Sequence, residues 1–344
     1  MRALLLALES GSPAWTIPAA EVVSLRRDFP GIQVTDAHDA AAVEAAVADA
    51  EILFSWALGE EVFAKARALR WLHLPAAGVG AFLTPSVRAR RPLVTNSRGV
   101  HAVPIAEHVL GMLIGLARGF SRAAREQAAG AMLRERWWEE EHVPRELFGK
   151  TLGLYGYGLI ARETARRAAA FGMRVVALKR DPGRPTPWEP ELLRTIGLPA
   201  AEPALAALYG PADFDRFLDE SDVVAITAAL TPETEGKFDA RAFRRMRPGS
   251  WLVNVARGKI VREEELVLAL RAGRPAAAAL DVFEREPLPP ESALYTLDNV
   301  ILTPHVSGLS TGFWPRAMSL FRANLAHYLH GEPLVNRVDL ERGY

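Results

Sequence analysis

The sequence contains no cysteine among its 344 residues. This absence excludes disulfide bonds, a thiolate nucleophile, and zinc or iron–sulfur sites with cysteine ligands. An excess of charge of one sign is missing too, because 41 basic residues balance 41 acidic residues. A protein without a basic field is poorly suited to hold a nucleic-acid backbone, so we expect no nucleic-acid partner. We expect no metal site either.

Long hydrophobic runs are also scarce. The apolar run Ala3–Leu8 ends at Glu9 and is shorter than the core of an export signal. The stretch 102–120 is mostly apolar but contains Glu107 and Arg118, which makes it a poor membrane span. We therefore expect a buried first strand, a buried helix, no membrane segment and a cytoplasmic location.

Short apolar runs alternate with helical patterns along the chain, which is typical of parallel β-α units. The predicted strands of the first hundred residues are Arg2–Leu8, Ile32–Thr35, Glu51–Phe54, Trp71–Leu74 and Leu93–Thr95. After residue 150 the predicted strands are Thr151–Tyr155, Arg174–Leu178, Val223–Ile226, Trp251–Asn254, Ala276–Asp281 and Val300–Leu302. The pattern predicts an α/β fold of two doubly wound parallel-sheet domains, Rossmann- or flavodoxin-like, with a cleft between them.

Two further segments bear on the organisation of these domains. A long helix beginning near Ala102 joins them, and we place the last helix, about 312–330, back on the first domain. Residues 181–211 contain seven prolines and exceed a usual β-α connection. A surface insertion is favoured over a functional flap on grounds of loop length.

A G-x-G-x-x-A motif follows the predicted strand Thr151–Tyr155 and opens a predicted helix, the context of a dinucleotide-binding turn. Gly156 would make the tight turn, and Gly158 would let the backbone approach a pyrophosphate at the positive end of the helix. A glycine turn without a ligand is the less favoured alternative. The cofactor-binding residues of this turn are Gly156, Tyr157, Gly158, Leu159 and Ile160, with Ala161 as the small packing residue.

The residues at the end of the next strand indicate whether the site prefers NAD or NADP. Where an NAD site usually carries an acidic residue for the ribose hydroxyls, this chain has Lys179 and Arg180. Two cations suit a 2′-phosphate, so NADP(H) is favoured over NAD(H). Asp181 could still bind the ribose in a shifted loop, and the two cations could be merely solvated.

Three segments just beyond predicted strands carry residue types that suit carbonyl reduction, and they contain Arg257, Glu286 and His305. An arginine can bind a substrate carboxylate with two hydrogen bonds. A histidine can protonate the carbonyl oxygen, and a carboxylate beside it orients the ring and favours the protonated form. Each residue alone is more often structural, so only the combination favours catalysis.

These segments, in this order, resemble the D-isomer-specific 2-hydroxyacid dehydrogenase family over nearly the whole chain. The motifs that carry the resemblance are Gly156–Ile160, Leu230–Thr234, Asn254–Gly258, Leu280–Phe283 with Glu286–Pro287, and Thr303–His305, together with Ala76–Val79, Thr95–Val100 and Ala106–His108. Lys179 in place of the common Asp is similar to the NADPH-dependent glyoxylate/hydroxypyruvate reductase branch.

The resemblance implies a role for each matching residue. Arg257 would bind the substrate carboxylate and carbonyl, His305 would donate the proton, and Glu286 would be its partner. The remaining implied contacts are the backbone N–H groups of Ala77, Gly78 and Val79 for the substrate, and Ala256 and Asp281 for the cofactor. Residues 1–101 and 310–344 would form the substrate domain, residues 102–309 the nucleotide domain, and dimers would form through the latter.

Two classes of function compete at this stage. The first is an NAD(P)H-dependent reductase of small 2-oxo acids, and the second is a dinucleotide-sensing binding protein similar to corepressor relatives on this fold. Oxidation of an inorganic or one-carbon anion is a third reading. Arg98 is either a second anion contact or paired with an acid such as Glu107, and Trp137 and Trp138 are placed at a dimer interface in preference to a partner's pocket. Candidate pocket residues are Leu74, Ala76, Trp56, Arg98, Phe313 and Trp314.

Overall fold

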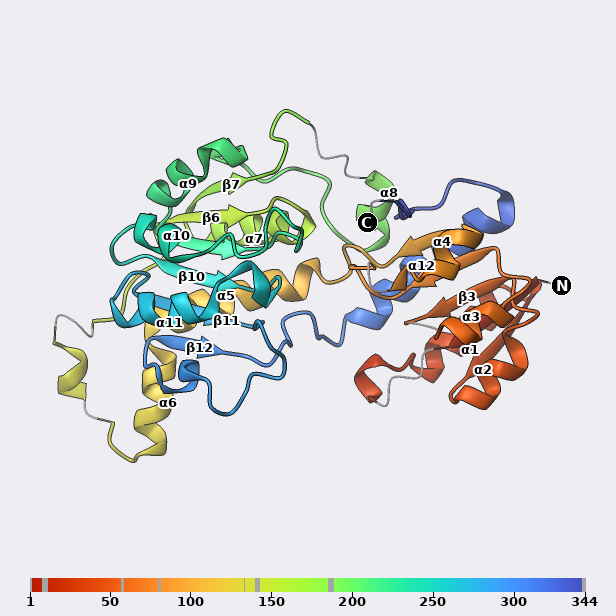
Figure 1. Cartoon of the computed structure of the whole chain (residues 1–344), viewed down its shortest axis with the longest axis horizontal. Coiled ribbons are helices and arrows are strands. Elements are labelled where there is room, and N and C mark those ends of the chain that lie inside the picture. Colours follow the sequence, from red (N-terminus) through yellow and green to blue (C-terminus); the bar gives the residue numbers. More distant parts are fainter. Residues whose placement is uncertain are drawn as a thin grey trace. The chain divides into compact units, whose positions relative to one another are not determined.

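The computed structural model describes residues 2–7, 12–56, 59–79, 82–132, 134–139, 143–184 and 189–341. The chain divides into two compact units (Figure 1). Unit 1 contains Met1–His101, Pro187–Ala200 and Leu309–Tyr344, and unit 2 contains Ala102–Thr186 and Ala201–Gly308. Each unit is built around its own parallel sheet.

The sheet of unit 1 has the strand order β2-β1-β3-β4-β5. Its strands are β1 (Arg2–Ala7), β2 (Ile32–Ala37), β3 (Ile52–Ser55), β4 (Trp71–Leu74) and β5 (Leu93–Asn96), and all neighbours pair in parallel. β3 and β4 are buried along their whole length, which explains why they read as continuous apolar runs. The carboxyl ends of these strands therefore meet at one edge, where loops can carry a binding site.

Helices cover both faces of this sheet. They are α1 (Ala19–Asp28), α2 (Ala40–Ala46), α3 (Glu60–Lys65), α4 (Pro85–Arg90), α8 (Pro190–Thr195) and α12 (Phe313–His330). One core contains Leu5, Leu53 and Leu72 with side chains of α2, α3 and α4. On α12, Phe321 stacks on Phe54 and Trp71 at ring-centroid distances of 4.7 and 5.3 Å. The last helix thus groups with unit 1.

The sheet of unit 2 has seven parallel strands in the order β12-β11-β10-β9-β6-β7-β8. They are β6 (Thr151–Tyr155), β7 (Arg174–Leu178), β8 (Ala207–Tyr209), β9 (Val223–Ile226), β10 (Trp251–Asn254), β11 (Ala277–Leu280) and β12 (Val300–Leu302). The order reverses direction between β6 and β9, which is the point at which ligands bind in open α/β sheets.

Alternate residues of the central strands of unit 2 enter two separate cores. One core holds Leu152 and Val253 with α5 (Ala102–Arg118) and α7 (Leu159–Ala170). The other holds Ile226 and Leu252 with α9 (Phe214–Glu220), α10 (Ala240–Arg245) and α11 (Glu263–Arg271). The sheet is therefore sandwiched between two helical layers (Figure 1), which confirms the predicted doubly wound α/β class.

The structure differs from the sequence-based expectation within 181–211. This stretch is not a plain surface insertion, because residues 190–195 form α8 and residues 207–209 form β8, which extends the sheet of unit 2. Residues 187–200 group with unit 1, whereas we expected 102–309 to stay together in the nucleotide domain. The physical reason is apolar burial: Leu192, Leu193 and Ile196 are each 3% exposed or less.

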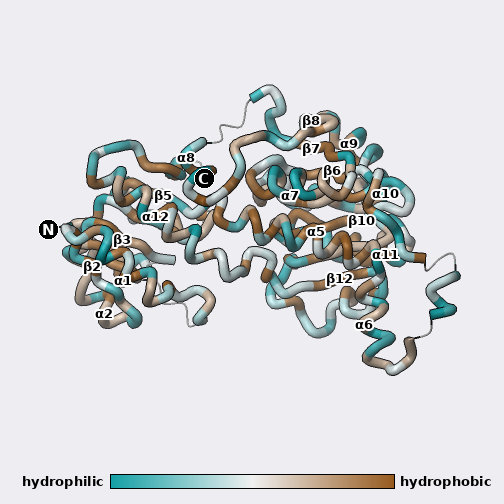
Figure 2. Tube along the Cα trace, turned by 180° about the vertical axis from the view of Figure 1, so that it is seen from behind, coloured by the Kyte–Doolittle hydropathy of each residue, from teal (hydrophilic) through white to brown (hydrophobic). Residues whose placement is uncertain are grey.

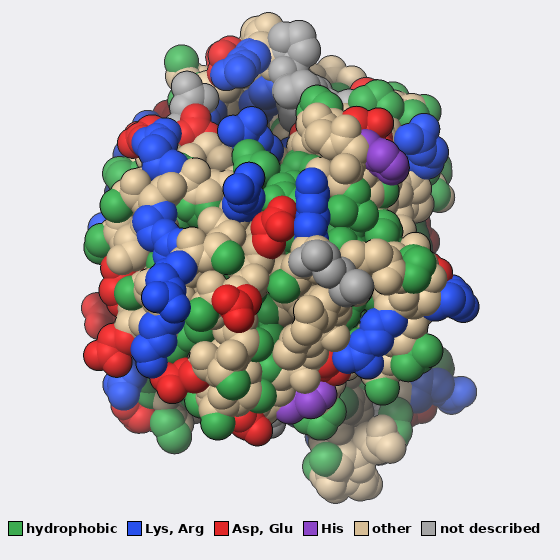
Figure 3. Space-filling view, turned by 90° about the vertical axis from the view of Figure 1, so that its right-hand side faces the viewer, with side chains coloured by type: hydrophobic (Ala, Val, Ile, Leu, Met, Phe, Trp, Pro, Cys, Tyr) green, Lys and Arg blue, Asp and Glu red, His purple; other side chains and the backbone are tan. Residues whose placement is uncertain are grey.

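The hydropathy of the helices and the charges at the surface agree with the arrangement of sheets and helical layers. Figure 2 shows α5 largely in hydrophobic colours, and ten of its residues are buried. No single helix of the described residues could cross a membrane by length and composition, although α5 and α6 (Phe120–Ala128), bent by 67°, pass that test as a pair. Basic and acidic side chains both occur on the face shown in Figure 3, in line with the balanced charge of the sequence.

Candidate active site

The glycine turn of unit 2 has the geometry of a phosphate cradle. Gly156 has a φ of 95°, and a Cβ there would lie 2.6 Å from the backbone of Ala228, so only glycine fits. A Cβ on Gly158, the N-cap of α7, would meet no atom within 4 Å. The buried Ala161 packs α7 closely onto the sheet. The open space at Gly158 and the first N–H groups of α7, which have no acceptor within the helix itself, suit a dinucleotide pyrophosphate.

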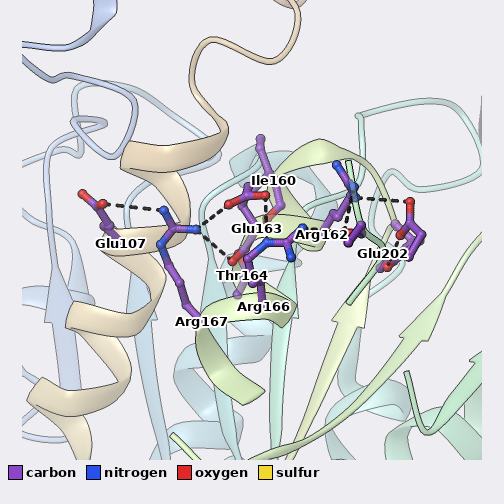
Figure 4. A network of polar contacts seen from close by, with 10 residues as sticks. Glu107, Ile160, Arg162, Glu163, Thr164, Arg166, Arg167 and Glu202 are labelled. Carbon is purple, nitrogen blue, oxygen red and sulfur yellow. Dashed lines mark hydrogen bonds and ion pairs between the residues drawn. The ribbon is translucent and has the colours of Figure 1, made fainter. Parts of the chain in front are cut away.

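A network of charged side chains fixes the first turns of α7 (Figure 4). Arg162, which is fully buried, pairs with Glu202 at 3.2 Å and donates to the carbonyl of Ala201 at 2.9 Å. The hydroxyl of Tyr157, inside the glycine motif, donates to the other oxygen of Glu202 at 3.2 Å. Burial, followed by the charge of Glu202, raises the pKa of Tyr157. The segment that returns from unit 1 is thereby tied to the phosphate cradle.

On its other side, α7 is joined to α5 by a second part of the same network (Figure 4). Glu163 is 2% exposed and accepts hydrogen bonds from Arg166 at 3.4 Å and from Arg167 at 2.6 Å. Arg167 also lies 3.7 Å from Glu107 of α5. These contacts hold α7 against α5, its neighbour in the same helical layer.

The loop after β7 carries the residues that would select the nucleotide. The N–H of Lys179 donates to the carbonyl of Tyr209 at 3.0 Å, and its ammonium group donates to the carbonyl of Arg184. Arg180 is exposed. Asp181 accepts a hydrogen bond from the N–H of Arg184 at 3.2 Å, so its carboxylate closes a local turn. Both predicted cations thus stand at the end of β7, beside the strand that leads to the glycine turn.

Arg257 follows β10 on a tightly determined loop. The amide of Asn254 donates to the carbonyl of Arg257 at 3.0 Å and accepts from the N–H of Ala256 at 3.1 Å. The guanidinium of Arg257 is exposed and donates to the carbonyl of Ala256 at 2.7 Å. A Cβ on Gly258 would lie 1.8 Å from the backbone carbon of Phe283. The loop of Arg257 therefore packs directly against the chain that follows β11.

Asp281 organises the loop that carries His305. It is fully buried, and its carboxylate accepts hydrogen bonds from the hydroxyl of Thr303 at 2.6 Å and from the N–H groups of Val306 and Ser307 at 2.9 Å each. The N–H of His305 donates to the carbonyl of Asp281 at 2.8 Å. His305 adopts a left-handed backbone with a φ of 55°, a conformation that needs such surrounding support.

Glu286 and His305 form a hydrogen-bonded pair. Nδ1 of His305 lies 2.7 Å from Oε2 of Glu286, and Oε1 of Glu286 accepts from the N–H of Phe283 at 3.1 Å. Nε2 of His305 has no partner among the residues that the structure describes, so this atom is available to a substrate. The structure thus joins Glu286 and His305 directly and connects the Arg257 loop to them through the Gly258–Phe283 contact.

A second histidine at this edge was not singled out for a role from the sequence. Nε2 of His108 on α5 lies 3.0 Å from the hydroxyl of Thr303 and 3.8 Å from Asp281. Burial lowers the pKa of His108, against the opposing charge of Asp281. The Ala106–His108 motif was the only sequence signal for it. Among the described residues, no group of three or more His, Asp or Glu side chains is placed to hold a metal ion.

In unit 1, the loop after β4 presents backbone N–H groups. Ala77 and Gly78 are exposed, and within the described residues the N–H groups of Ala77, Gly78 and Val79 donate to no protein acceptor. Consecutive free N–H groups form a concavity that suits an anion. Asn96, at the end of β5, donates to the carbonyl of Ala77 at 2.9 Å and so holds the loop from outside.

The side-chain candidates of unit 1 lie in three different environments. Trp56, Phe313 and Trp314 lie in one aromatic cluster, in which Phe313 is 4.9 Å from Trp314 and 6.2 Å from Trp56. Arg98 forms an ion pair with Glu189 at 3.3 Å, and therefore has a partner that the sequence did not suggest. Leu74 is buried and Ala76 is half-buried.

A parallel sheet with a phosphate cradle at its switch point, an arginine and a histidine–carboxylate pair defines a NAD(P)-dependent oxidoreductase. The model of the D-isomer specific 2-hydroxyacid dehydrogenase NAD binding domain matches residues 110–307. The chain belongs to this family.

Three relatives illustrate the similarity. The chain is 34% identical to a glyoxylate reductase of Korarchaeum cryptofilum over 82% of its own length and 79% of that protein. It is 32% identical to a D-3-phosphoglycerate dehydrogenase of Archaeoglobus fulgidus, over 81% of this chain but only about half (49%) of that protein. A crystal structure from Xanthobacter autotrophicus Py2, a family member in complex with NADPH and MES, has a TM-score of 0.78 at 27% identity and covers 100% of this chain and 99% of that one.

Proposed function

We propose that this protein reduces a small 2-oxo acid to the D-2-hydroxy acid, as a reductase of the glyoxylate/hydroxypyruvate type. The observation that carries the proposal is the His305–Glu286 pair, whose Nδ1–Oε2 distance of 2.7 Å leaves Nε2 of the histidine for a substrate. Arg257, Glu286 and His305 follow β10, β11 and β12, which are adjacent strands, so the three side chains extend from one edge of the sheet.

Each residue has a distinct task in this proposal. Arg257 binds the substrate carboxylate and polarises the carbonyl, and the N–H groups of Ala77, Gly78 and Val79 bind the carboxylate as well. Bound NADPH supplies the hydride to the carbonyl carbon. His305 donates a proton from Nε2 to the carbonyl oxygen, and Glu286 stabilises the charged ring and fixes its orientation. Ala256 and Asp281 would hold the nicotinamide end of the cofactor.

NADP(H) is the favoured cofactor and NAD(H) is the alternative. Lys179 and Arg180 support the preference because a 2′-phosphate needs cations, whereas ribose hydroxyls need an acceptor. The relative from Xanthobacter autotrophicus binds NADPH, which is consistent with this reading. Gly156, Tyr157, Gly158, Leu159 and Ile160 would hold the pyrophosphate.

The test follows the loss of absorbance of NADPH and, separately, of NADH with glyoxylate, hydroxypyruvate, pyruvate, phenylpyruvate and oxaloacetate. Turnover with NADPH is expected. Turnover with NADH alone would retain the reaction but contradict the assignment of Lys179 and Arg180. Cofactor binding without turnover would favour the dinucleotide-sensing alternative, which the names of the relatives do not support.

We also propose a homodimer formed through unit 2. Phe120, Trp138 and Phe148 are 58%, 64% and 75% exposed in this unit. The unit also has a hollow of about 750 Å³, which is lined in part by Trp137 and Trp251. Light scattering after size exclusion is expected to give twice the chain mass, and Trp138→Glu to weaken association. Val23→Glu, a similarly exposed position in unit 1, is the matched control. We also propose a cytoplasmic location, where NADPH is available to the reaction.

A further inference from the structure

We propose that Asn336 and Asn96 are positioning residues for the substrate-binding loop at 76–79, and that Glu189 completes their network. The proposal rests on the proposed function, in which this loop binds the substrate carboxylate. It assigns a role to the C-terminal tail and to the segment 189–200, neither of which supplies a group that touches substrate.

The chain of contacts begins at the loop itself. The amide of Asn96 donates to the carbonyl of Ala77 at 2.9 Å, and the N–H of Ser97 donates to the carbonyl of Ala76 at 3.1 Å. The carbonyls of Ala76 and Ala77 are therefore occupied by β5 and the residue after it, whereas the N–H groups of residues 77–79 donate to no protein acceptor within the described residues and suit an anion. Asn96 is 4% exposed, so water does not compete for its amide.

Asn336 fixes Asn96 in turn. Its side-chain amide donates to the backbone carbonyls of Asn96 at 3.3 Å and of Arg98 at 2.8 Å. The backbone carbonyl of Asn336 accepts from the N–H of Asn96 at 3.2 Å. Asn336 is 2% exposed and has a φ of 57°, a left-handed backbone that asparagine and glycine tolerate better than other residues. Asn336 of the C-terminal tail thus binds the end of β5 through both its side chain and its backbone.

Glu189 closes the network from the segment that enters unit 1 after β7. One oxygen of its carboxylate accepts from the N–H of Asn336 at 3.4 Å, and the other accepts from Arg98 at 3.3 Å. The segment is anchored beyond Glu189 as well, because Glu191 pairs with His327 at 3.0 Å and Ser319 donates to the carbonyl of Thr195 at 3.1 Å. The segment that carries Glu189 is therefore held against α12 within unit 1.

The decisive variant is Asn336→Gly. Glycine keeps the left-handed backbone but removes both side-chain donors. We expect the KM for the best 2-oxo acid of the panel to rise on the order of tenfold, with the KM for NADPH unchanged and kcat altered less than KM. The matched control is Asn299→Ala in unit 2, because Asn299 likewise donates to two carbonyls, those of Leu270 and Ala276, but touches no part of the substrate loop.

Two further variants keep the test decisive if Asn336→Gly does not fold. Asn96→Asp retains the acceptor for the N–H of Arg98 but loses the donor to Ala77, so it should raise the KM at least as much. Glu189→Gln, at an exposed side chain, should raise the KM about two- to threefold. A wild-type KM in these variants, or a change no larger than that of Asn299→Ala at equal loss of melting temperature, would overturn the positioning role. Absence of 2-oxo acid turnover in the wild type would instead remove the proposed function and the inference with it.

Discussion

Protonation of one buried histidine should destabilise unit 1 as the pH falls. His73 on β4 is fully buried, and burial lowers its pKa to about 3 from an ordinary value of 6.5. Nδ1 lies 2.7 Å from the hydroxyl of Thr95 and Nε2 lies 3.2 Å from the hydroxyl of Ser97. Because Trp71 donates to the hydroxyl of Thr95, that hydroxyl can in turn donate a hydrogen bond to Nδ1, which favours the neutral ring with its hydrogen on Nε2.

The sign and size of the effect follow from proton linkage. Below pH 6.5 the unfolded chain binds a proton at His73 and the folded chain does not, so the stability contributed by the neutral ring is complete above pH 6.5 and is lost as the pH falls toward 3. At about 1.4 kcal/mol per pKa unit, the loss at pH 5 is about 2 kcal/mol.

Urea unfolding of the wild type and of His73→Gln at pH 8, 6.5 and 5 tests this reasoning. Glutamine cannot titrate, so the variant should be less stable at pH 8 but lose about 2 kcal/mol less than the wild type between pH 8 and pH 5. His330→Gln, at an exposed position of α12, should lose as much as the wild type. Parallel losses in the wild type and His73→Gln would refute the argument.

Four further predictions concern the active site. Arg257→Ala should lower kcat/KM on the order of 10²- to 10³-fold with the Kd for NADPH unchanged in fluorescence titration, and an unchanged kcat/KM would exclude its role. Glu286→Gln should lower kcat at least about tenfold without weakening NADPH binding, whereas a wild-type kcat would show that the pair is only structural. Gly258→Ala should abolish most turnover at unchanged cofactor binding, because its Cβ collides with the backbone after β11, and full activity would contradict the close packing. Replacing Lys179 and Arg180 by Asp and Ala should lower the preference for NADPH over NADH at least about tenfold, and a constant ratio of kcat/KM values would refute the 2′-phosphate reading.

The strands could be predicted because a strand that is buried on both faces of the sheet consists of a continuous run of apolar residues. Trp71–Leu74, Thr151–Tyr155 and Trp251–Asn254 occur with the predicted bounds, and Ala276–Asp281 is shortened by one residue at each end. The candidate catalytic residues could be identified from the sequence for a related reason. Each follows such a strand, so the position of the strand fixes the edge of the sheet on which the residue lies.

The part of the fold that could not be predicted lies where tertiary packing overrides local composition. β8 has only three residues, too few for an alternating or continuous apolar pattern, and it forms because β7 offers a free edge. The proline-rich flanks of α8 indicated a loop, whereas the burial of Leu192 and Leu193 against unit 1 makes it a helix. No local signal reports burial against a helix more than a hundred residues away.

The groups that hold the candidate site divide along the same line. Asp281 lies within a motif and was assigned to the cofactor, yet its three hydrogen bonds to Thr303, Val306 and Ser307 also fix the left-handed backbone of His305. A motif can therefore identify such a residue without disclosing what it supports. Asn336 lies in no motif, and its hydrogen bond to Asn96 of β5 joins residues that are 240 positions apart in the sequence. Residues that touch the substrate are constrained by chemistry and stand out in a sequence, whereas residues that position them are constrained by geometry, which only the folded chain reveals.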